Sequence, residues 1–542
     1  MMKVNYINIL ERKIEAVELQ FAHGSITSLT CIGGEDKQLP YVLPGFVDAH
    51  VHIESSMLTP SQFARLAVVH GTVATVSDPH EIANVLGMQG VEYMISEGKR
   101  SPFKFCFGAP SCVPATIFET AGAVLDAEDI ASLLSKEEVG YLAEVMNFPG
   151  VLNGEQDLLK KLEWAKKFGK PIDGHAPGLR GADAKAYIDA GISTDHECFT
   201  YEEASEKIKY GAKILIREGS AARNFEALVP LFKHHPADLM FCSDDKHPDN
   251  LEEGHINLLV KRALLLGYNL WDVLKAACIN PVHHYNLPVG LLYPQQPADF
   301  IVIDNLSDFN ILETYLDGAL VAKDGKSLLP DLRSEHPNLF NCLPTKPDDF
   351  IIKAKNLPVP VRVIDALEGQ LITNSSLASL PLTERGYQSD PKQDVLKITV
   401  INRYENAKPA VGFIRNFGLS KGAMASSVGH DSHNILAVGC DDMSISKAVN
   451  LIIENKGGLA AVGPDREMIL PLPIAGLMTD RDGYQVAKDY TKLDQYVKDE
   501  LHSTLKSPFM TLSFMALLVI PALKLSDKGL FDGNKFEFVA LE

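Results

Sequence analysis

The sequence predicts an α/β protein built on a (β/α)8 TIM-like barrel, with a flanking small β-sandwich and a separate C-terminal α/β or α+β domain. From about residue 42 to residue 248, short runs rich in β-branched and aromatic residues alternate with longer segments of helical period, as in parallel strands joined by crossover helices. Eight such runs match the strand count of a (β/α)8 barrel. Nearly every run ends in an ionisable residue, which a doubly wound sheet would not be expected to show.

The order of the elements along the chain divides it into four parts. Residues 1–42 and 286–328 carry short alternating strands with Gly and Pro turns, and we expect them to pair into one small β-sandwich. Residues 43–285 form the predicted barrel, and the Pro-rich polar stretch 329–347 is typical of a linker. Residues 348–542 mix strand and helix patterns and predict the C-terminal domain. The eight barrel strands are predicted at 43–50, 72–78, 103–109, 140–146, 170–176, 191–197, 212–218 and 238–245.

Composition excludes several partners and compartments. The 542 residues carry 70 Asp plus Glu against 51 Lys plus Arg, a net charge of -19 that repels phosphate backbones and anionic membranes. We therefore expect no nucleic acid polymer and no membrane as partner. Eight scattered cysteines with no CxxC pair and no signal peptide indicate a cytoplasmic protein with reduced thiols. The most apolar stretch, Phe509 to Leu523, is too short to span a membrane and predicts a buried element.

The strand ends predict a metal site. His50 and His52 are alternate residues of one strand, so both imidazoles face the same way and can reach one cation. An isolated HxH is more often structural, but two further histidines and a carboxylate on later strands match the ligands of borderline divalent ions. The predicted ligands are His50, His52, Glu144, His175, His196 and Asp244. Glu144 is the candidate bridge between two ions.

Asp244 ends the eighth run and has a second predicted role. It can ligate one ion and also take a proton from a metal-bound water, whose pKa the ions lower toward neutrality. Asp245 is the fallback for this role, although a turn residue before Lys246 is the simpler reading.

Three further segments are candidates for substrate contact. The segment SDPHEIAN places His80 and Glu81 at the barrel mouth, where they could contact substrate or transfer protons, and Asp78 joins the predicted substrate-binding residues; a plain turn is the alternative. In IREGSAA, contact and a structural role are equally open for Arg217, Glu218 and Ser220. The segment GHDSHNI contains His430, Asp431 and His433, which could fold over the barrel mouth, bind a further ion or only hold their own domain together.

These segments together resemble a known family. LPGFVDAHVHIESSML resembles the first strand of the amidohydrolase superfamily. A series of further segments, taken together and in order, resembles the bacterial adenine deaminase family. These segments are SDPHEIANVLG, PSCVPAT, EVMNFPGV, DGHAPGL, TDHEC, IREGSAA, SDDKHP, GHDSHNI, LPLPIAGLM and PFMTLSF. Two positions differ from the family pattern, Ser243 in place of threonine and Gly429 in place of alanine.

The resemblance implies an activity, cofactors and a substrate. It implies conversion of adenine to hypoxanthine and ammonia with two divalent ions per chain, Mn or Fe, with Zn also possible. The family's ligands map onto the six residues already named from the strand ends. We also expect a homo-oligomer, a dimer. As a mechanistic hypothesis, a water between the ions attacks C6, Asp244 shuttles a proton to the leaving amine, and Glu81, with His80 near, serves N1.

Two other classes of function are alternatives. The first is an amidohydrolase acting on a cyclic amide or a related aminopurine. Enzymes of the dihydroorotase or hydantoinase kind generally bridge their metals through a carbamylated lysine on the fourth strand, where this chain has Glu144. The second is a catalytically silent binding protein, which should have lost ligands, whereas this chain retains all six.

Overall fold

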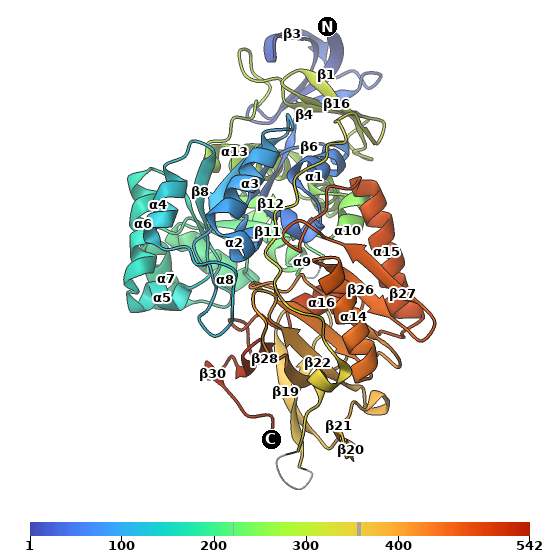
Figure 1. The fold of residues 1–542 in the computed structure, drawn as a ribbon. Helices are drawn as coiled ribbons and strands as arrows, with labels where there is room; N and C mark the ends of the chain where they lie inside the picture. The colour runs from blue at the N-terminus through green and yellow to red at the C-terminus, as the bar shows by residue number, and fades with distance from the viewer. Residues whose placement is uncertain (221, 355–358) are drawn as a thin grey trace.

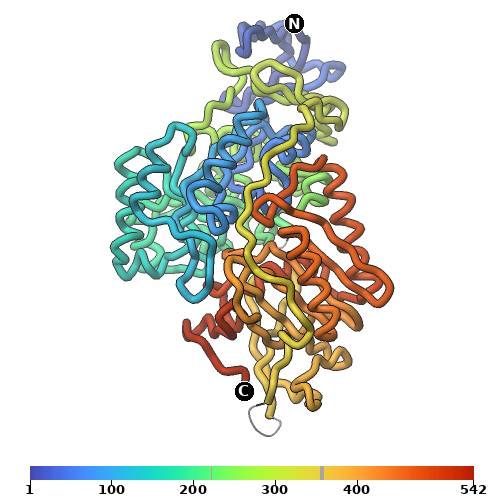
Figure 2. Tube along the Cα trace, in the orientation of Figure 1, coloured from blue at the N-terminus to red at the C-terminus, as the bar shows by residue number. Residues whose placement is uncertain are grey.

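A computed structural model describes residues 1–220, 222–354 and 359–542. Figure 1 shows three regions: a sheet near the N-terminus at the top, a barrel in the middle and a C-terminal domain below it. Residues 328–346, all of them described, form no helix or strand. In Figure 2 this yellow segment runs over the barrel from the upper sheet to the C-terminal domain, where we predicted a linker.

The barrel strands pair in parallel and in chain order. Pairing joins β5 to β9 and β10 to β12, and β13 pairs back with β5. The predicted α/β class is therefore confirmed. The eighth run is split at Ser243 into β12 and β13. The strands are β5 (Phe46–His52), β6 (Thr72–Ser77), β7 (Lys104–Ala109), β8 (Val139–Val145), β9 (Ile172–Gly174), β10 (Thr194–Asp195), β11 (Lys213–Arg217), β12 (Leu239–Cys242) and β13 (Asp244–Asp245).

Helices follow most of these strands and cover the outside of the barrel (Figure 1). Local chemistry sets their ends: the Thr200 hydroxyl accepts a hydrogen bond from the Glu203 amide where α8 begins, and Gly211 with a φ of 109° ends it. The helices are α1 (Pro60–Ala67), α2 (His80–Leu86), α3 (Met88–Gly98), α4 (Ala127–Leu134), α5 (Phe148–Asn153), α6 (Gln156–Lys167), α7 (Gly181–Asp189), α8 (Tyr201–Tyr210), α9 (Phe225–Leu228), α10 (Pro248–Glu253), α11 (Ile256–Leu265), α12 (Leu270–Leu274) and α13 (Asn280–Tyr285).

The two segments that flank the barrel, which we expected to form a β-sandwich, are hydrogen bonded as one eight-stranded sheet. Its order is β17-β16-β15-β14-β4-β1-β2-β3, so strands from before and after the barrel meet at β4 and β14. Buried side chains such as Val4, Leu19 and Phe300 give this sheet a small core of its own. The strands are β1 (Met2–Asn8), β2 (Lys13–Ala22), β3 (Ser25–Gly34), β4 (Tyr41–Pro44), β14 (Phe300–Ile303), β15 (Ile311–Leu316), β16 (Ala319–Lys323) and β17 (Lys326–Ser327).

The C-terminal domain is of the α+β kind. Its main sheet has the order β19-β18-β23-β22-β25-β24-β26-β27 and is antiparallel except where β18 pairs with β23. These strands are β18 (Val361–Ala366), β19 (Thr373–Ala378), β22 (Val395–Ile401), β23 (Ala410–Arg415), β24 (Ala423–Ser426), β25 (Ile435–Gly439), β26 (Gly458–Val462) and β27 (Glu467–Pro471). Three helices and two small sheets accompany it in the described part of the chain. They are α14 (Asp442–Glu454), α15 (Gly483–Asp499), α16 (Pro508–Ser513), the pair β20 (Leu382–Thr383) and β21 (Gly386–Tyr387), and the three strands β28 (Leu523–Ser526), β29 (Gly529–Asp532) and β30 (Glu537–Phe538).

The C-terminal domain packs directly on the barrel. The Thr479 amide donates to the Met57 carbonyl at 2.9 Å, and Leu58 forms a β-bridge with Thr479. One apolar core contains buried side chains of both regions, including Phe63 of the barrel and Met478 of the C-terminal domain.

None of the helices in the described part of the chain is long and apolar enough to cross a membrane.

Candidate metal centre and active site

The first barrel strand carries the predicted histidine pair into the centre of the mouth. His50 and His52 lie two residues apart on β5, and their Nε2 atoms approach to 3.2 Å. Both side chains are buried, and His50 stacks on His196 with ring centroids 4.0 Å apart. The HxH therefore faces a group of donors, as its spacing predicts.

Glu144 lies at the centre of this group. From β8, its Oε2 faces His175 Nδ1 at 2.7 Å and His196 Nε2 at 3.1 Å, and its Oε1 faces His52 Nε2 at 3.6 Å. The two oxygens of one carboxylate thus face histidines from different strands. This is the arrangement that a ligand shared by two cations requires, and nitrogen and oxygen donors of this kind suit borderline divalent ions.

Asp244 approaches the same histidines from the eighth strand. Its Oδ1 lies 3.2 Å from His52 Nε2 and 3.6 Å from His50 Nε2. Ligand atoms of His50, His196 and Asp244 lie within 4.8 Å of one another, as do those of Glu144, His175 and His196. The structure therefore brings all six predicted ligands together. Five of them form these two overlapping groups, and His52 joins them through its contacts with Glu144 and Asp244.

The protonation states of His50 and of the two carboxylates suit metal binding. Neighbouring carboxylates outweigh burial and raise the pKa values of His52, His175 and His196, so these three imidazoles lose a proton when a metal binds. Burial lowers the pKa of His50 well below its usual value, so this imidazole is neutral. Burial alone would raise the pKa of Glu144, but His175 and His196 hold it well below its usual value. Burial would also raise the pKa of Asp244, but the positive charge of Arg217 outweighs this effect and holds the pKa well below its usual value. Neutral imidazoles and ionised carboxylates are the forms that metals bind.

The backbone break at Ser243 places Asp244. Asp48, fully buried on β5, accepts hydrogen bonds from the Ser243 amide at 3.0 Å, from the Ser243 hydroxyl, and from His255 Nε2 at 2.7 Å. Asp244 follows with a φ of 55°, a region that favours glycine. A serine and a threonine both supply the hydroxyl that Asp48 binds, so the departure from the family pattern at Ser243 preserves this contact.

Arg217 reaches the cavity from β11 and binds two carboxylates. Its guanidinium donates to Asp244 Oδ2 at 2.6 Å and pairs with Glu197, with Nη2 to Oε2 at 3.1 Å. Arg217 and Glu197 both line the cavity. Of the three residues predicted in IREGSAA, only Arg217 lies there.

The other two residues of that segment lie elsewhere. Glu218 accepts from Arg262 at 3.0 Å, and the Ser220 hydroxyl donates to Asn250 at 2.8 Å and accepts from the His247 amide. Neither lines the cavity, so their contact with substrate stays a prediction without side-chain contacts to support it. Ala221, in the same segment, lies outside the described residues.

The second barrel strand ends in a polar turn. One residue of this turn, His80, lines the cavity, and another, Asp78, lies behind His80. His80 lines the cavity, with Nδ1 3.4 Å from Glu144 Oε1. Asp78 lies behind it, accepting from the His80 amide at 3.0 Å and facing His80 Nδ1 at 3.2 Å. Burial opposes protonation of His80, but Asp78 raises the pKa of this imidazole well above its usual value. His80 is therefore set up as a cation or proton donor.

Glu81 is one side chain removed from the cavity. It is fully buried, and the Ser55 hydroxyl lies 2.8 Å from Glu81 Oε1 and 2.6 Å from Asp245 Oδ1. Asp245, not Glu81, lines the cavity. Burial, together with the charges of Glu54 and Asp245, raises the pKa of Glu81 well above its usual value. A protonated Glu81 is consistent with the predicted role as an acid.

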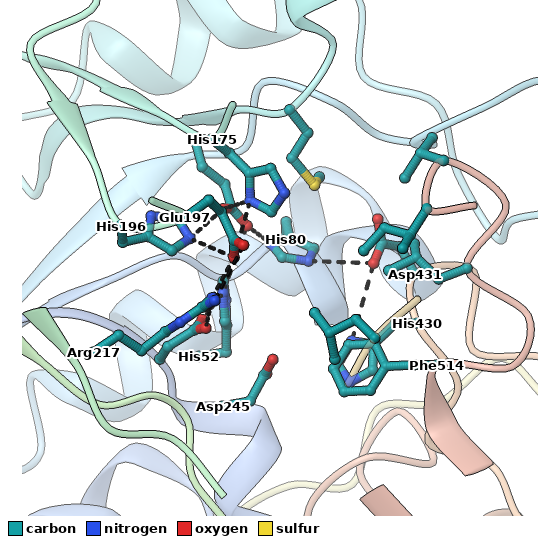
Figure 3. Close-up of a pocket in the computed structure, with 17 residues that line it drawn as sticks. His52, His80, His175, His196, Glu197, Arg217, Asp245, His430, Asp431 and Phe514 are labelled. Carbon is teal, nitrogen blue, oxygen red and sulfur yellow. Dashed lines mark hydrogen bonds and ion pairs between the residues drawn. The ribbon is translucent and has the colours of Figure 1, made fainter. Parts of the chain in front are cut away.

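Part of the C-terminal histidine cluster covers the barrel mouth (Figure 3). His430 and Asp431 line the cavity, with His430 Nδ1 3.5 Å from Glu81 Oε1 and Asp431 Oδ1 3.8 Å from His80 Nε2. His433 does not line it; its Nδ1 accepts from the Gly429 amide at 3.2 Å. Two of the three residues thus lie at the mouth, as one of the three possibilities expects. Binding of a further ion stays a prediction, since His430 also forms a group of possible metal donors with Glu81 and Asp245.

An apolar roof completes the cavity from the C-terminal domain. Phe514 stacks on His430 with centroids 4.4 Å apart and an interplanar angle of 10°. Lys524, fully buried, holds two roof residues by donating to the carbonyls of Leu371 at 2.7 Å and Phe514 at 2.9 Å. The apolar lining is Met146, Leu371, Phe514, Leu517, Val519 and Ile520.

Sequence reasoning missed several of these cavity residues. Glu197 stands directly after the predicted ligand His196, so adjacency was an available signal. Asp245 was considered only as a fallback for Asp244, with a turn residue as the simpler reading. The apolar stretch that we predicted to be a buried element contains the cavity residues Leu517, Val519 and Ile520. The polar residues that interrupt this stretch are the one sequence feature that distinguishes it from an ordinary core segment.

Comparison with known proteins agrees with this geometry. Residues 41–321 match the model of the amidohydrolase family, and residues 370–537 match that of the adenine deaminase C-terminal domain. Together with the barrel and its buried ligands, these matches define a metal-dependent hydrolase that acts on C–N bonds. Enzymes of the amidohydrolase family use divalent metal ions.

Three curated relatives extend over nearly the whole chain, and each is called adenine deaminase. The protein from Sulfurovum sp. is 56% identical over 99% of both chains, and that from Salinibacter ruber 56% identical over 92% of this chain and 91% of its own. The protein from Borreliella burgdorferi is 49% identical over 99% and 98%. The chain belongs to the adenine deaminase family.

Among solved structures, a beta-aspartyl dipeptidase from Fervidobacterium islandicum aligns with 62% of this chain and 99% of its own, at 16% identity and a TM-score of 0.45.

Proposed function

We propose that the protein hydrolyses adenine to hypoxanthine and ammonia at a pair of divalent ions held by His50, His52, Glu144, His175, His196 and Asp244. The observation that carries this proposal is Glu144, whose two oxygens face histidines of different strands at 2.7, 3.1 and 3.6 Å. Membership of the adenine deaminase family supports the choice of substrate.

When bound, the ions lower the pKa of a water toward neutrality and so make a hydroxide available at neutral pH. The residues of the chain do the remaining work. Asp244, ionised and oriented by Arg217, accepts a proton at Oδ1 or Oδ2 and passes it to the amine that leaves C6. Glu81, protonated, is the source of the proton that N1 requires. Because Glu81 lies behind the cavity wall, this proton passes through the Ser55 hydroxyl to Asp245, which lines the cavity, and His80 is a second donor.

The cavity also offers the base an apolar wall. The roof residues Leu371, Phe514 and Leu517 face the polar floor, so a planar base fits between apolar side chains above and ionic groups below. A low-dielectric wall strengthens each charge–dipole contact with the base.

Three finer properties belong to the same proposal. The ions are Mn or Fe, with Zn as an alternative, because His and carboxylate ligands suit all three. The eight cysteines are all free, which fits the reducing cytoplasm as the compartment. The assembly is a homodimer, and neither nucleic acid nor a membrane is a partner of this acidic chain.

An ammonia-release screen tests the proposal. Metal-free protein is reloaded separately with Mn, Fe and Zn and offered adenine, substituted aminopurines and cyclic amides. We expect ammonia from adenine well above every other compound with at least one metal. Opening a cyclic amide releases no ammonia, so these compounds are followed by chromatography of the ring-opened acid. Ring opening of a cyclic amide, with no ammonia from adenine, would instead identify the enzyme as the other kind of amidohydrolase.

A further inference from the structure

Five carboxylates line the cavity, and four of them are already engaged. Glu144 and Asp244 belong to the ligand group, Glu197 pairs with Arg217, and Asp245 accepts from Ser55. Asp431 is different. Its Oδ1 lies 3.8 Å from His80 Nε2 and 4.0 Å from His430 Nδ1, both beyond ordinary hydrogen-bond distance.

The second oxygen of Asp431 has no hydrogen-bond partner among the residues that the structure describes. This Oδ2 is buried, and the whole residue is only 3% exposed. A buried carboxylate oxygen without a donor is costly, so its presence in a cavity wall points to a donor on the ligand. Figure 3 shows Asp431 opposite the metal-ligand group, beside His430 and Phe514.

The spacing of the site indicates which part of the ligand reaches Asp431. The imidazole ring of His80 separates the two regions: its Nδ1 lies 3.4 Å from Glu144 Oε1 and its Nε2 lies 3.8 Å from Asp431 Oδ1. A purine whose C6 lies at the metal ligands extends its five-membered ring in the direction away from them. In an unsubstituted base that ring carries one N–H donor, and in a nucleoside it carries none.

We propose that Asp431 is a specificity-determining residue whose Oδ2 accepts a hydrogen bond from the ring N–H of an unsubstituted purine base. This inference rests on the proposed function and adds a role for the C-terminal domain: it selects free bases over bases substituted at N9. The barrel supplies the chemistry, and a segment more than 180 residues beyond Asp244 supplies the selection.

Paired substrates and variants test the role of Asp431. The kcat/KM of the metal-loaded parent, Asp431→Asn and Asp431→Ala is measured with adenine and with 9-methyladenine. For Asp431→Ala we expect a loss on the order of 100-fold with adenine, the size of a hydrogen bond to a charged group, and a change below about threefold with 9-methyladenine. Asp431→Asn keeps an acceptor oxygen without the charge and should fall between parent and alanine variant.

Binding provides a readout that does not depend on turnover. Calorimetry with hypoxanthine and 9-methylhypoxanthine should show the same pattern: Asp431→Ala weakens only the unsubstituted product. His80→Asn is the contrasting variant, because His80 lies beside the metal ligands and its loss should lower kcat/KM for both adenines alike. Asp527→Asn is the matched control: Asp527 accepts from the Thr120 amide and from Asn402, outside the cavity, so discrimination should stay at the parent value.

Equal losses with both adenines in Asp431→Ala, or no loss with either, would overturn the inference. The parent protein separates this result from failure of the proposed function. If the parent releases no ammonia from adenine, the proposed function fails; if it does and discrimination survives in Asp431→Ala, only the role of Asp431 fails.

Discussion

Glu144 is the residue on which the ligand group depends most. Its two oxygens face His175, His196 and His52, and the imidazoles keep it ionised despite burial. We predict that Glu144→Gln binds fewer than two ions and loses at least about 10³-fold in kcat, because a neutral amide cannot stabilise two cations. Elemental analysis and ammonia release measure both effects.

A comparable substitution at the other end of the barrel is the control. Asp238 pairs with Lys213 at the surface, at 2.6 Å, and such exposed pairs contribute little. Asp238→Asn should keep full metal content and activity. Two ions and parental turnover in Glu144→Gln would contradict the bridging role.

Glu81 gives a second residue-scale prediction. Because burial and the charges of Glu54 and Asp245 keep it protonated, Glu81→Gln removes an acid without changing its shape. We expect kcat to fall by about 10²- to 10⁴-fold with both ions still bound. Near-parental turnover with two ions present would assign N1 protonation to another group, and Asp245→Asn would then be the next variant to measure.

At this scale the sequence predicted well which donor side chains lie together, and their surroundings less well. His50, His175 and Asp244 could be predicted because parallel strands bring their carboxyl ends to one mouth. Asp245 could not be separated from a turn residue, because its access to the cavity depends on the break at Ser243 and on the contact with Ser55. Asp431 and Leu517 come from another domain. Folding over the mouth was one of three possibilities for the segment of Asp431, and no local pattern indicates which part of the barrel Leu517 covers.

At the scale of elements, the turn after β13 joins the barrel to α15. His247, which precedes α10, is buried, and its Nδ1 lies 2.6 Å from the Tyr490 hydroxyl on α15. Burial lowers the pKa of His247 from 6.5 to about 3. The folded protein therefore keeps this imidazole neutral over a range in which the unfolded chain protonates it.

This difference predicts the direction of a pH effect. Above pH 6.5 both states are neutral, and the contribution of His247 to stability is fully present. Between 6.5 and about 3 the unfolded chain binds one more proton, so the free energy of unfolding falls as the pH falls, by up to about 1.4 kcal/mol per unit. In His247→Gln, thermal melts at several pH values should show a shallower acid decline than the parent. Identical slopes would contradict the prediction.

The element pattern itself was predictable where period and length agreed. The eight runs correspond to β5 through β13, because β-branched runs bounded by turns leave little choice of secondary structure. The split of the last run was not predictable. It coincides with four hydrogen bonds to Asp48, and two of the donors, the Ser243 hydroxyl and His255 Nε2, lie 195 and 207 residues further along the chain.

At the scale of the whole molecule, the barrel and the C-terminal domain share one apolar core and one cavity. We therefore predict that they unfold in a single transition, and that chelation of the metals lowers the melting temperature of the whole chain, because ligands that bind only the folded state stabilise it. Calorimetry with and without chelator measures both. Two separate transitions, with only one sensitive to chelator, would mean that the domains are stable independently.

Metal titration of the apoprotein most directly tests the central claim, which is that the protein deaminates adenine with two bound ions per chain. Mn²⁺ is added in increments while bound metal and ammonia release from adenine are measured on the same samples. We predict that activity rises until two ions are bound per chain and then stays constant. Full activity at one ion per chain, or two bound ions without ammonia, would contradict it.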